Sequence, residues 1–328
     1  PAGRGTRRLT GAILLLLAMV ILLAAVISLA VTGPGSDPVP SGDAAARAPG
    51  KLTPAPANID PAAERVTVGL YALDAYSINP ESSTFYMTGY LWLRWSGPID
   101  PMDSLEFVNA VDETNLTVKV STDEPRLLAS GEKVQDLKFQ GRFYEPFNMT
   151  HYPLDSQRLN IVVESDRYPI STLVFVPDAE GSGVDSQFVV PGWNVSNKVE
   201  TRSLIHTFGT EFGYPADSGA DTYSAAVFSL SMDRSHSLMI WKILLPLFLV
   251  LVTAWLALLV SPVYPEIRMA MPATALLTAV FLQEVAKLPW TSTPVTLDRI
   301  YVVAFASIVV TLALVIWDVQ DVRGSKGS

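Results

Sequence analysis

Long apolar runs lie at the two ends of the chain. The first, from Leu9 to Thr32, contains no charged side chain, and about 20 apolar residues in a helix are enough to cross a bilayer. It is longer than the roughly 7–15 apolar residues of a cleaved signal peptide, so we favour an uncleaved anchor over a removed leader. Three more apolar stretches close the chain, at Leu238–Val260, Ala270–Leu288 and Ile300–Trp317. The pattern predicts a transmembrane anchor at residues 9–32 and a three-helix transmembrane domain at residues 236–318.

Basic side chains are placed as expected for four spans that alternate in direction. They precede the first run, separate the second from the third, and follow the last: Arg4, Arg7, Arg8, Arg268, Arg323 and Lys326. Cytoplasmic segments of membrane proteins are enriched in Lys and Arg. We therefore expect residues 1–8 and 319–328 in the cytoplasm and the large intervening domain outside. The Ala-rich composition favours a bacterial source, which makes the compartment a bacterial inner or plasma membrane.

The middle of the chain consists of short stretches in which apolar and polar residues alternate. Residues 33–63 are rich in Pro, Ala and Gly, have no apolar period, and predict an extended linker. Strands are predicted at Val66–Leu73, Phe85–Trp95, Leu116–Val120, Leu159–Glu164, Leu173–Val176, Phe188–Val190 and Ala225–Ser231. Many short strands at this spacing are typical of a β-sandwich, here residues 64–235. The predicted fold class is a β-sandwich extracellular domain plus an α-helical transmembrane domain, with one N-terminal and three C-terminal spans.

Composition narrows the function. The 328 residues carry a net charge of -9, which disfavours nucleic acid because phosphate binding requires clustered Lys and Arg. Charged residues make up 17% of the chain, less than the roughly 25% of soluble proteins. Cysteine is absent, which excludes disulfides, Cys-bound metals and thiol catalysis. Catalytic and metal-binding motifs are also missing, so we expect neither an enzyme nor a metal or other cofactor.

Three motifs together resemble a known family. VGLYALDAYSINPESSTFYMTGYLWLRW (Val68–Trp95) is similar to a first β-hairpin, and PFNMTHYPLDSQRLNIVVE (Pro146–Glu164) to a signature loop with a YPxDxQ core. RSHSLMIWKILLPL (Arg234–Leu247) has an Arg that precedes a Leu-Pro pair at the start of an apolar helix. The sequence resembles pentameric ligand-gated ion channels, especially bacterial ones, whose signature loop lacks the cysteines of animal members.

The resemblance implies a homopentamer in membrane lipid, whose outside domain binds a small ligand or protons and opens a pore. The family normally has four helices after the outside domain, whereas three follow it here. The alternative is therefore a non-conducting membrane sensor or accessory subunit that keeps the receptor fold. The N-terminal run is a candidate for the place of the fourth helix.

The resemblance places the coupling between the two domains at the signature loop. It puts Asp155 and Pro153 of the loop beside Arg234, whose guanidinium a carboxylate can pair. Asn79 and Glu81 of the first hairpin are the nearest further partners. The alternative is a purely structural ion pair.

The third apolar run is the pore-lining helix by resemblance. Spacings of three and four residues put five positions on one face, Ala270, Thr274, Leu277, Phe281 and Glu284. Glu266 would line the inner mouth of the pore, and Glu284 lies near its outer end. Rings of Leu277 and Phe281 would form an apolar gate, and rings of Glu favour cations. Alternatively, Glu284 and Lys287 are an i,i+3 ion pair at a helix end.

The ligand site is the least specified. By resemblance, aromatic residues at Trp193, Phe208, Phe212 and Tyr214 are the candidates, because ring faces can hold a cation. Each of them can equally serve core packing or loop anchoring. The three histidines, His151, His206 and His236, have the side chain that titrates near neutral pH, although a lone histidine is more often structural.

Overall fold

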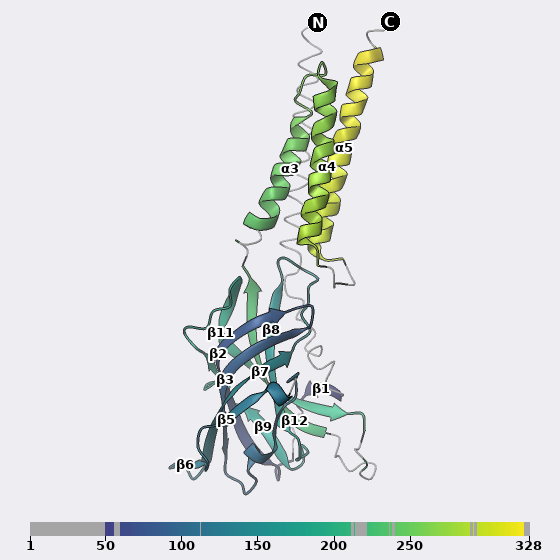
Figure 1. Cartoon of the computed structure of the whole chain (residues 1–328). Helices are drawn as coiled ribbons and strands as arrows, with labels where there is room; N and C mark the ends of the chain where they lie inside the picture. Colours follow the sequence, from purple (N-terminus) through teal and green to yellow (C-terminus); the bar gives the residue numbers. More distant parts are fainter. Residues whose placement is uncertain are drawn as a thin grey trace. The chain divides into compact units, whose positions relative to one another are not determined.

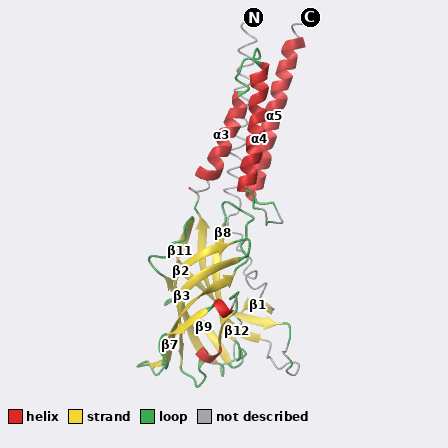
Figure 2. Cartoon of the chain, in the orientation of Figure 1, coloured by secondary structure: helices red, strands yellow, loops and turns green. Residues whose placement is uncertain are grey.

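The computed structural model describes residues 50–55, 60–111, 113–210, 213, 222–235, 237, 240–288, 291 and 294–324. The predicted anchor at residues 9–32 lies outside this range, as do Phe212, Tyr214 and His236. Two compact units emerge (Figures 1 and 2). The sheet unit comprises the described residues up to Asn148 and Ser156–Arg234, and the helical unit comprises Met149–Asp155 and the described residues from Ser235 onward.

The sheet unit contains two sheets. The five-stranded sheet has the order β1 (Gly50–Pro54), β11 (Trp193–Phe208), β12 (Thr222–Arg234), β8 (Ser156–Ser165) and β4 (Leu105–Phe107). The seven-stranded sheet runs β10 (Gly183–Val184), β2 (Glu64–Asn79), β3 (Thr84–Trp95), β7 (Lys133–Tyr144) and β5 (Thr117–Val120), with β6 (Arg126–Leu127) beside β7 and β9 (Leu173–Pro177) beside β2. Short 3-10 helices occur at η2 (Pro101–Ser104) and η3 (Glu113–Asn115).

One apolar core joins the two sheets. Phe85 of β3 and Phe139 of β7 lie in the same buried cluster as Ile161 of β8 and Phe228 of β12. Alternate residues of β3 are buried, as expected for a strand with one face toward a core. Most residues of β8 and the middle of β12 are buried, which explains their continuous apolar runs. The expected β-sandwich character of this unit is confirmed.

The structure differs from the predicted strands in two segments. The expected strand at Phe188–Val190 is wrong, because these residues form a loop whose Phe188 and Val190 side chains are buried in the core. The range expected to be a linker, residues 33–63, includes β1, which pairs antiparallel with β11 from Gly50–Phe208 to Pro54–Leu204. Backbone hydrogen bonding to a sheet edge requires no apolar period, so composition alone does not reveal such a strand.

The helical unit contains a π-turn η4 (Ile240–Leu244) followed by α3 (Leu245–Leu256), α4 (Pro265–Ala286) and α5 (Thr296–Gly324). Among the described residues, two helices are long and apolar enough to cross a membrane, Pro265–Ala286 and Thr296–Gln320, while the apolar helix Ile240–Leu256 is shorter. The wide turn ends where Pro246 enters the first turn of α3, a position at which a missing N–H is tolerated.

Candidate functional site

Helix α4 has one buried side and one exposed side. The buried row consists of Arg268, Pro272, Ala275 and Ala279. The six residues predicted to line a pore are all exposed: Glu266, Ala270, Thr274, Leu277, Phe281 and Glu284. Both rows follow spacings of three and four residues, which return to one side of a helix with 3.6 residues per turn. The predicted face thus lies on the side of α4 that does not pack against the other residues that the structure describes.

Two large apolar side chains lie in the middle of the exposed face. Leu277 is 59% exposed and Phe281 64% exposed. These exposed fractions are large for apolar side chains, whose burial away from water is favourable. They require cover from lipid, from another chain, or from copies of themselves around an axis. Near the end of α4, the Glu284 carboxylate lies 3.4 Å from the Lys287 ammonium. The i,i+3 pair of the alternative interpretation is therefore present, and Glu284 still belongs to the exposed face.

The signature loop contacts the start of α5. The backbone oxygen of Thr150 accepts hydrogen bonds from the Thr296 N–H at 3.0 Å and the Thr296 hydroxyl at 3.2 Å. The backbone oxygen of Tyr152 accepts the Leu297 N–H at 3.1 Å. The first N–H groups of a helix have no partner within that helix. The loop therefore caps α5, a contact that the sequence did not indicate.

The base of the signature loop is closed by one side chain. The Gln157 side-chain oxygen accepts the backbone N–H of Asn148 at 3.1 Å, and its amide donates to the Asn148 backbone oxygen at 2.8 Å. Pro153 is buried within the loop and follows a cis peptide bond from Tyr152. Gln157 of the YPxDxQ motif thus fixes the base of the loop by its two hydrogen bonds to the Asn148 backbone.

The other predicted coupling residues are divided between the two units. Asp155 is buried in the helical unit, whereas Arg234 ends β12 in the sheet unit, with its guanidinium carbon 4.2 Å from the centre of the Trp193 ring. Their ion pair stays a prediction. The Asn79 side-chain oxygen accepts the backbone N–H of Glu81 at 3.0 Å, so Asn79 shapes the β2–β3 turn, and Glu81 is exposed.

A polar cavity of about 430 Å³ opens in the sheet unit. It is lined by Glu106, Glu164, Ser165, Asp166, Arg167, Phe208 and Tyr223. The lining residues thus include three with carboxyl groups, one with a guanidinium and two with aromatic rings. Such a lining suits a small cation or an amine, which carboxylates pair and ring faces attract. The acidic residues were missed by the sequence prediction because they come from separate segments.

A buried acid–base pair borders this cavity. The His206 Nδ1 atom lies 2.7 Å from a Glu164 oxygen, and both side chains are inaccessible to solvent or nearly so. Burial raises the pKa of Glu164, and the hydrogen bond and charge of His206 oppose that rise. The Phe208 ring centre is 4.1 Å from that of His206. Of the aromatic candidates within the described residues, Phe208 lines the polar cavity, and its role in ligand binding stays a prediction.

Trp193 does not share that cavity. It begins β11 and Phe208 ends it, and this strand has 16 residues, so the two rings are about 50 Å apart along an extended strand. Trp193 packs instead against Arg234. His151 is half-buried in the signature loop.

A second buried acid lies elsewhere in the sheet unit. Glu145 is 4% exposed, and its Oε2 atom has no hydrogen-bond partner within the part of the chain that the structure describes. Burial raises the pKa of Glu145 to about 8, although Asn160, Arg202 and Arg158 each lower it. A carboxyl group with this pKa changes its charge near neutral pH.

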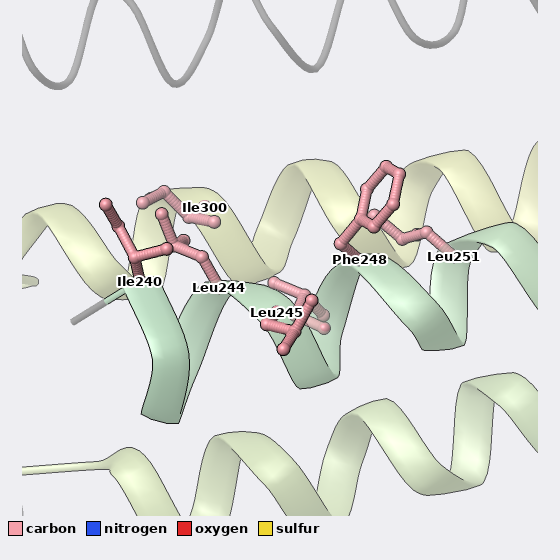
Figure 3. Close-up of a pocket in the computed structure, with 7 residues that line it drawn as sticks. Ile240, Leu244, Leu245, Phe248, Leu251 and Ile300 are labelled. Carbon is pink, nitrogen blue, oxygen red and sulfur yellow. The ribbon is translucent and has the colours of Figure 1, made fainter. Parts of the chain in front are cut away.

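The helical unit carries an apolar cavity of about 260 Å³ between α3 and α5. Figure 3 shows Ile240, Leu244, Phe248 and Leu251 following one another along the chain, with Ile300 of α5 beside them. The lining has no charged or hydrogen-bonding side chain, so the cavity accepts only apolar groups.

Comparison with known proteins agrees with the motifs. No family model matches the sequence. The chain is similar to a proton-gated ion channel of Gloeobacter violaceus, with 24% identity over 215 residues that cover 58% of this chain and 55% of that protein. The chain thus matches about half the length of this relative. The match agrees with the resemblance found in the sequence, because the chain is a distant relative of this ion channel. The matched protein is an ion channel and not an enzyme.

Proposed function

We propose that this chain is the subunit of a homopentameric, cation-selective channel in a bacterial inner or plasma membrane, opened from outside by protons or a small ligand. The observation that carries the proposal is the exposed face of α4. It bears two acidic residues, small or polar side chains at Ala270 and Thr274, and two large apolar ones between them and Glu284. Cyclic assembly of five copies would place this face around a common axis.

The exposed face has the features that a cation pore needs. Glu266 in the first turn and Glu284 near the end of α4 would form acidic rings, which attract cations. Leu277 and Phe281 would form rings between them that close the pore by excluding water. Leu277 and Phe281 have little cover from the other described residues, and that cover would then come from copies of themselves.

Two features support activation from outside. The sheet unit offers the polar cavity with Glu106, Glu164 and Asp166, which suits a cationic ligand. It also holds Glu145, whose raised pKa makes it a candidate proton sensor, and the matched relative is described as proton-gated. The signature loop would pass a movement of the sheet unit to α5 through the bonds from Thr296 and Leu297.

The membrane arrangement follows from the expected spans. Residues 9–32, α3, α4 and α5 would each cross the bilayer, with lipid around the bundle, both chain termini in the cytoplasm and the sheet unit outside. In this arrangement Asp155 and Arg234 would pair at the membrane surface, with Asn79 and Glu81 nearby.

The test is ion flux through the full chain reconstituted in lipid vesicles. Acid steps from pH 8 to pH 5 should start Na⁺ or K⁺ flux with little Cl⁻ flux, and particles in mild detergent should show five-fold rings. Glu266→Gln should reduce the cation preference, whereas Glu124→Gln, at an exposed position between β5 and β6 of the sheet unit, is the matched control. Monomers or dimers without flux would contradict the proposal.

The second candidate is a non-conducting sensor with the same fold. It is favoured by the short helix Ile240–Leu256, because only two described helices reach spanning length. Such a protein would give no flux at any pH while still binding an amine in the polar cavity.

A further inference from the structure

Arg268 is tied to two helices at once. Its side chain is 3% exposed although it lies in the first turns of α4. The Arg268 Nη1 atom donates to an Asp318 oxygen of α5 at 2.7 Å, and Nε donates to the backbone oxygen of Ala257, which caps the end of α3, at 3.1 Å. One guanidinium therefore holds the neighbouring ends of α3, α4 and α5 together.

Both contacts have a clear physical reason. The last carbonyl groups of a helix have no partner in that helix, and a cation near them is favoured by the helix dipole. A charged side chain that is buried requires a paired and hydrogen-bonded partner, because desolvation of an unpaired charge is costly. Asp318, whose side chain is 30% exposed, supplies the charge, and Ala257 supplies the carbonyl.

The pairing also decides which charge the exposed face of α4 displays. Glu266 is exposed, whereas Arg268, two residues later, is turned to the buried row. Without Asp318, the long Arg268 side chain would move to water at the same end of α4. Its positive charge would then oppose the negative charge of Glu266.

We propose that Asp318 is a positioning residue for ion selectivity, which holds Arg268 on the buried side of α4 so that Glu266 alone sets the charge at this end of the pore. This inference rests on the proposed function, in which the exposed face of α4 lines the pore. Asp318 acts through Arg268 and does not itself touch the permeating ion.

The experiment measures the K⁺/Cl⁻ permeability ratio of the full chain in bilayers, from the reversal potential in a salt gradient. Asp318→Asn should lower the ratio at least about twofold, since one unit charge about 8 Å away in water changes a local ion concentration by about that factor. Asp318→Glu should retain the ratio of the unmodified protein. The double variant Arg268→Gln/Asp318→Asn removes both charges and should also retain it.

The reversal potential distinguishes this role from a structural one. Loss of a purely structural ion pair would reduce the number of active channels but leave the ratio of those that remain unchanged. An unchanged ratio in Asp318→Asn would therefore overturn the inference. If that variant does not fold, the double variant decides: a rise of about twofold or more in its cation preference would mean that Arg268 already faces the pore. Absence of current in the unmodified protein would instead refute the proposed function.

Discussion

Replacement of Glu145 by Gln tests whether the sheet unit contains a group that titrates near neutral pH. The folded-state pKa is about 8, against an ordinary value of 4.5. Since the pKa is raised, folding favours the protonated form. The stabilisation is fully present below pH 4.5 and is lost as the pH rises through 8.

The size of this effect follows from linkage between protonation and folding. Between pH 5 and pH 9 the Glu145 contribution falls by about 4 kcal/mol, at roughly 1.4 kcal/mol per pKa unit. Glu145→Gln keeps the shape of the protonated acid but cannot ionise. The difference in stability between the unmodified protein and this variant should therefore change by that amount over this pH range.

Thermal unfolding of the full chain in mild detergent is the assay. For a domain of 150–250 residues, about 2–4 °C of Tm corresponds to 1 kcal/mol, so the Tm difference should change by on the order of 10 °C between pH 5 and pH 9. The exposed Glu81→Gln variant is the control and should follow the unmodified protein. Parallel Tm curves for the Glu145→Gln variant and the unmodified protein would refute a raised pKa at this position.

Two further substitutions test packing and the buried pair. Ala279→Leu should destabilise the helical unit by about 1–3 kcal/mol through overpacking. Ala273→Leu, on the exposed side of α4, is the control and should not destabilise it. Equal losses of Tm in the two variants would show that α4 is packed differently. His206→Leu leaves the buried Glu164 carboxyl without its His206 partner and should lower the free energy of unfolding by about 3–5 kcal/mol, measured by denaturant unfolding. The double variant Glu164→Leu/His206→Leu should recover part of that loss. No recovery would mean that the histidine contributes by packing alone.

Periodicity was sufficient to predict the exposed face of α4, because helix geometry alone places Glu266 and Leu277 on one side. It also predicted β3 and β12, whose apolar residues are continuous or alternate regularly. It was insufficient for β7 and most of β11, since both strands carry many polar residues on their outer faces. Such strands are recognised only through their partners in the sheet.

The contacts that depend on tertiary structure could not be predicted from the sequence. Thr296 and Thr150 are far apart in the chain, and the acceptor of both bonds between them is the Thr150 backbone oxygen, which carries no sequence signal. The cavity joins Glu106 to Glu164 across β4 and β8, a pairing that no motif records. The contact between Asp318 and Arg268 likewise has no sequence signal, because Asp318 is a single acidic residue near the end of an apolar helix.

In the proposed channel, the exposed face of α4 meets water in the assembled protein. Because the chain has no cysteine, single cysteines at Thr274 and Leu277 can be tested in vesicles with a charged, membrane-impermeant thiol reagent, with Ala275 and Ala279 as controls on the buried row. If this face lines a pore, the cysteines at positions 274 and 277 react at rates that rise under activating acid, and the controls stay unreactive. Unreactive cysteines at both exposed positions, in protein that is folded and activated, would contradict the proposed channel.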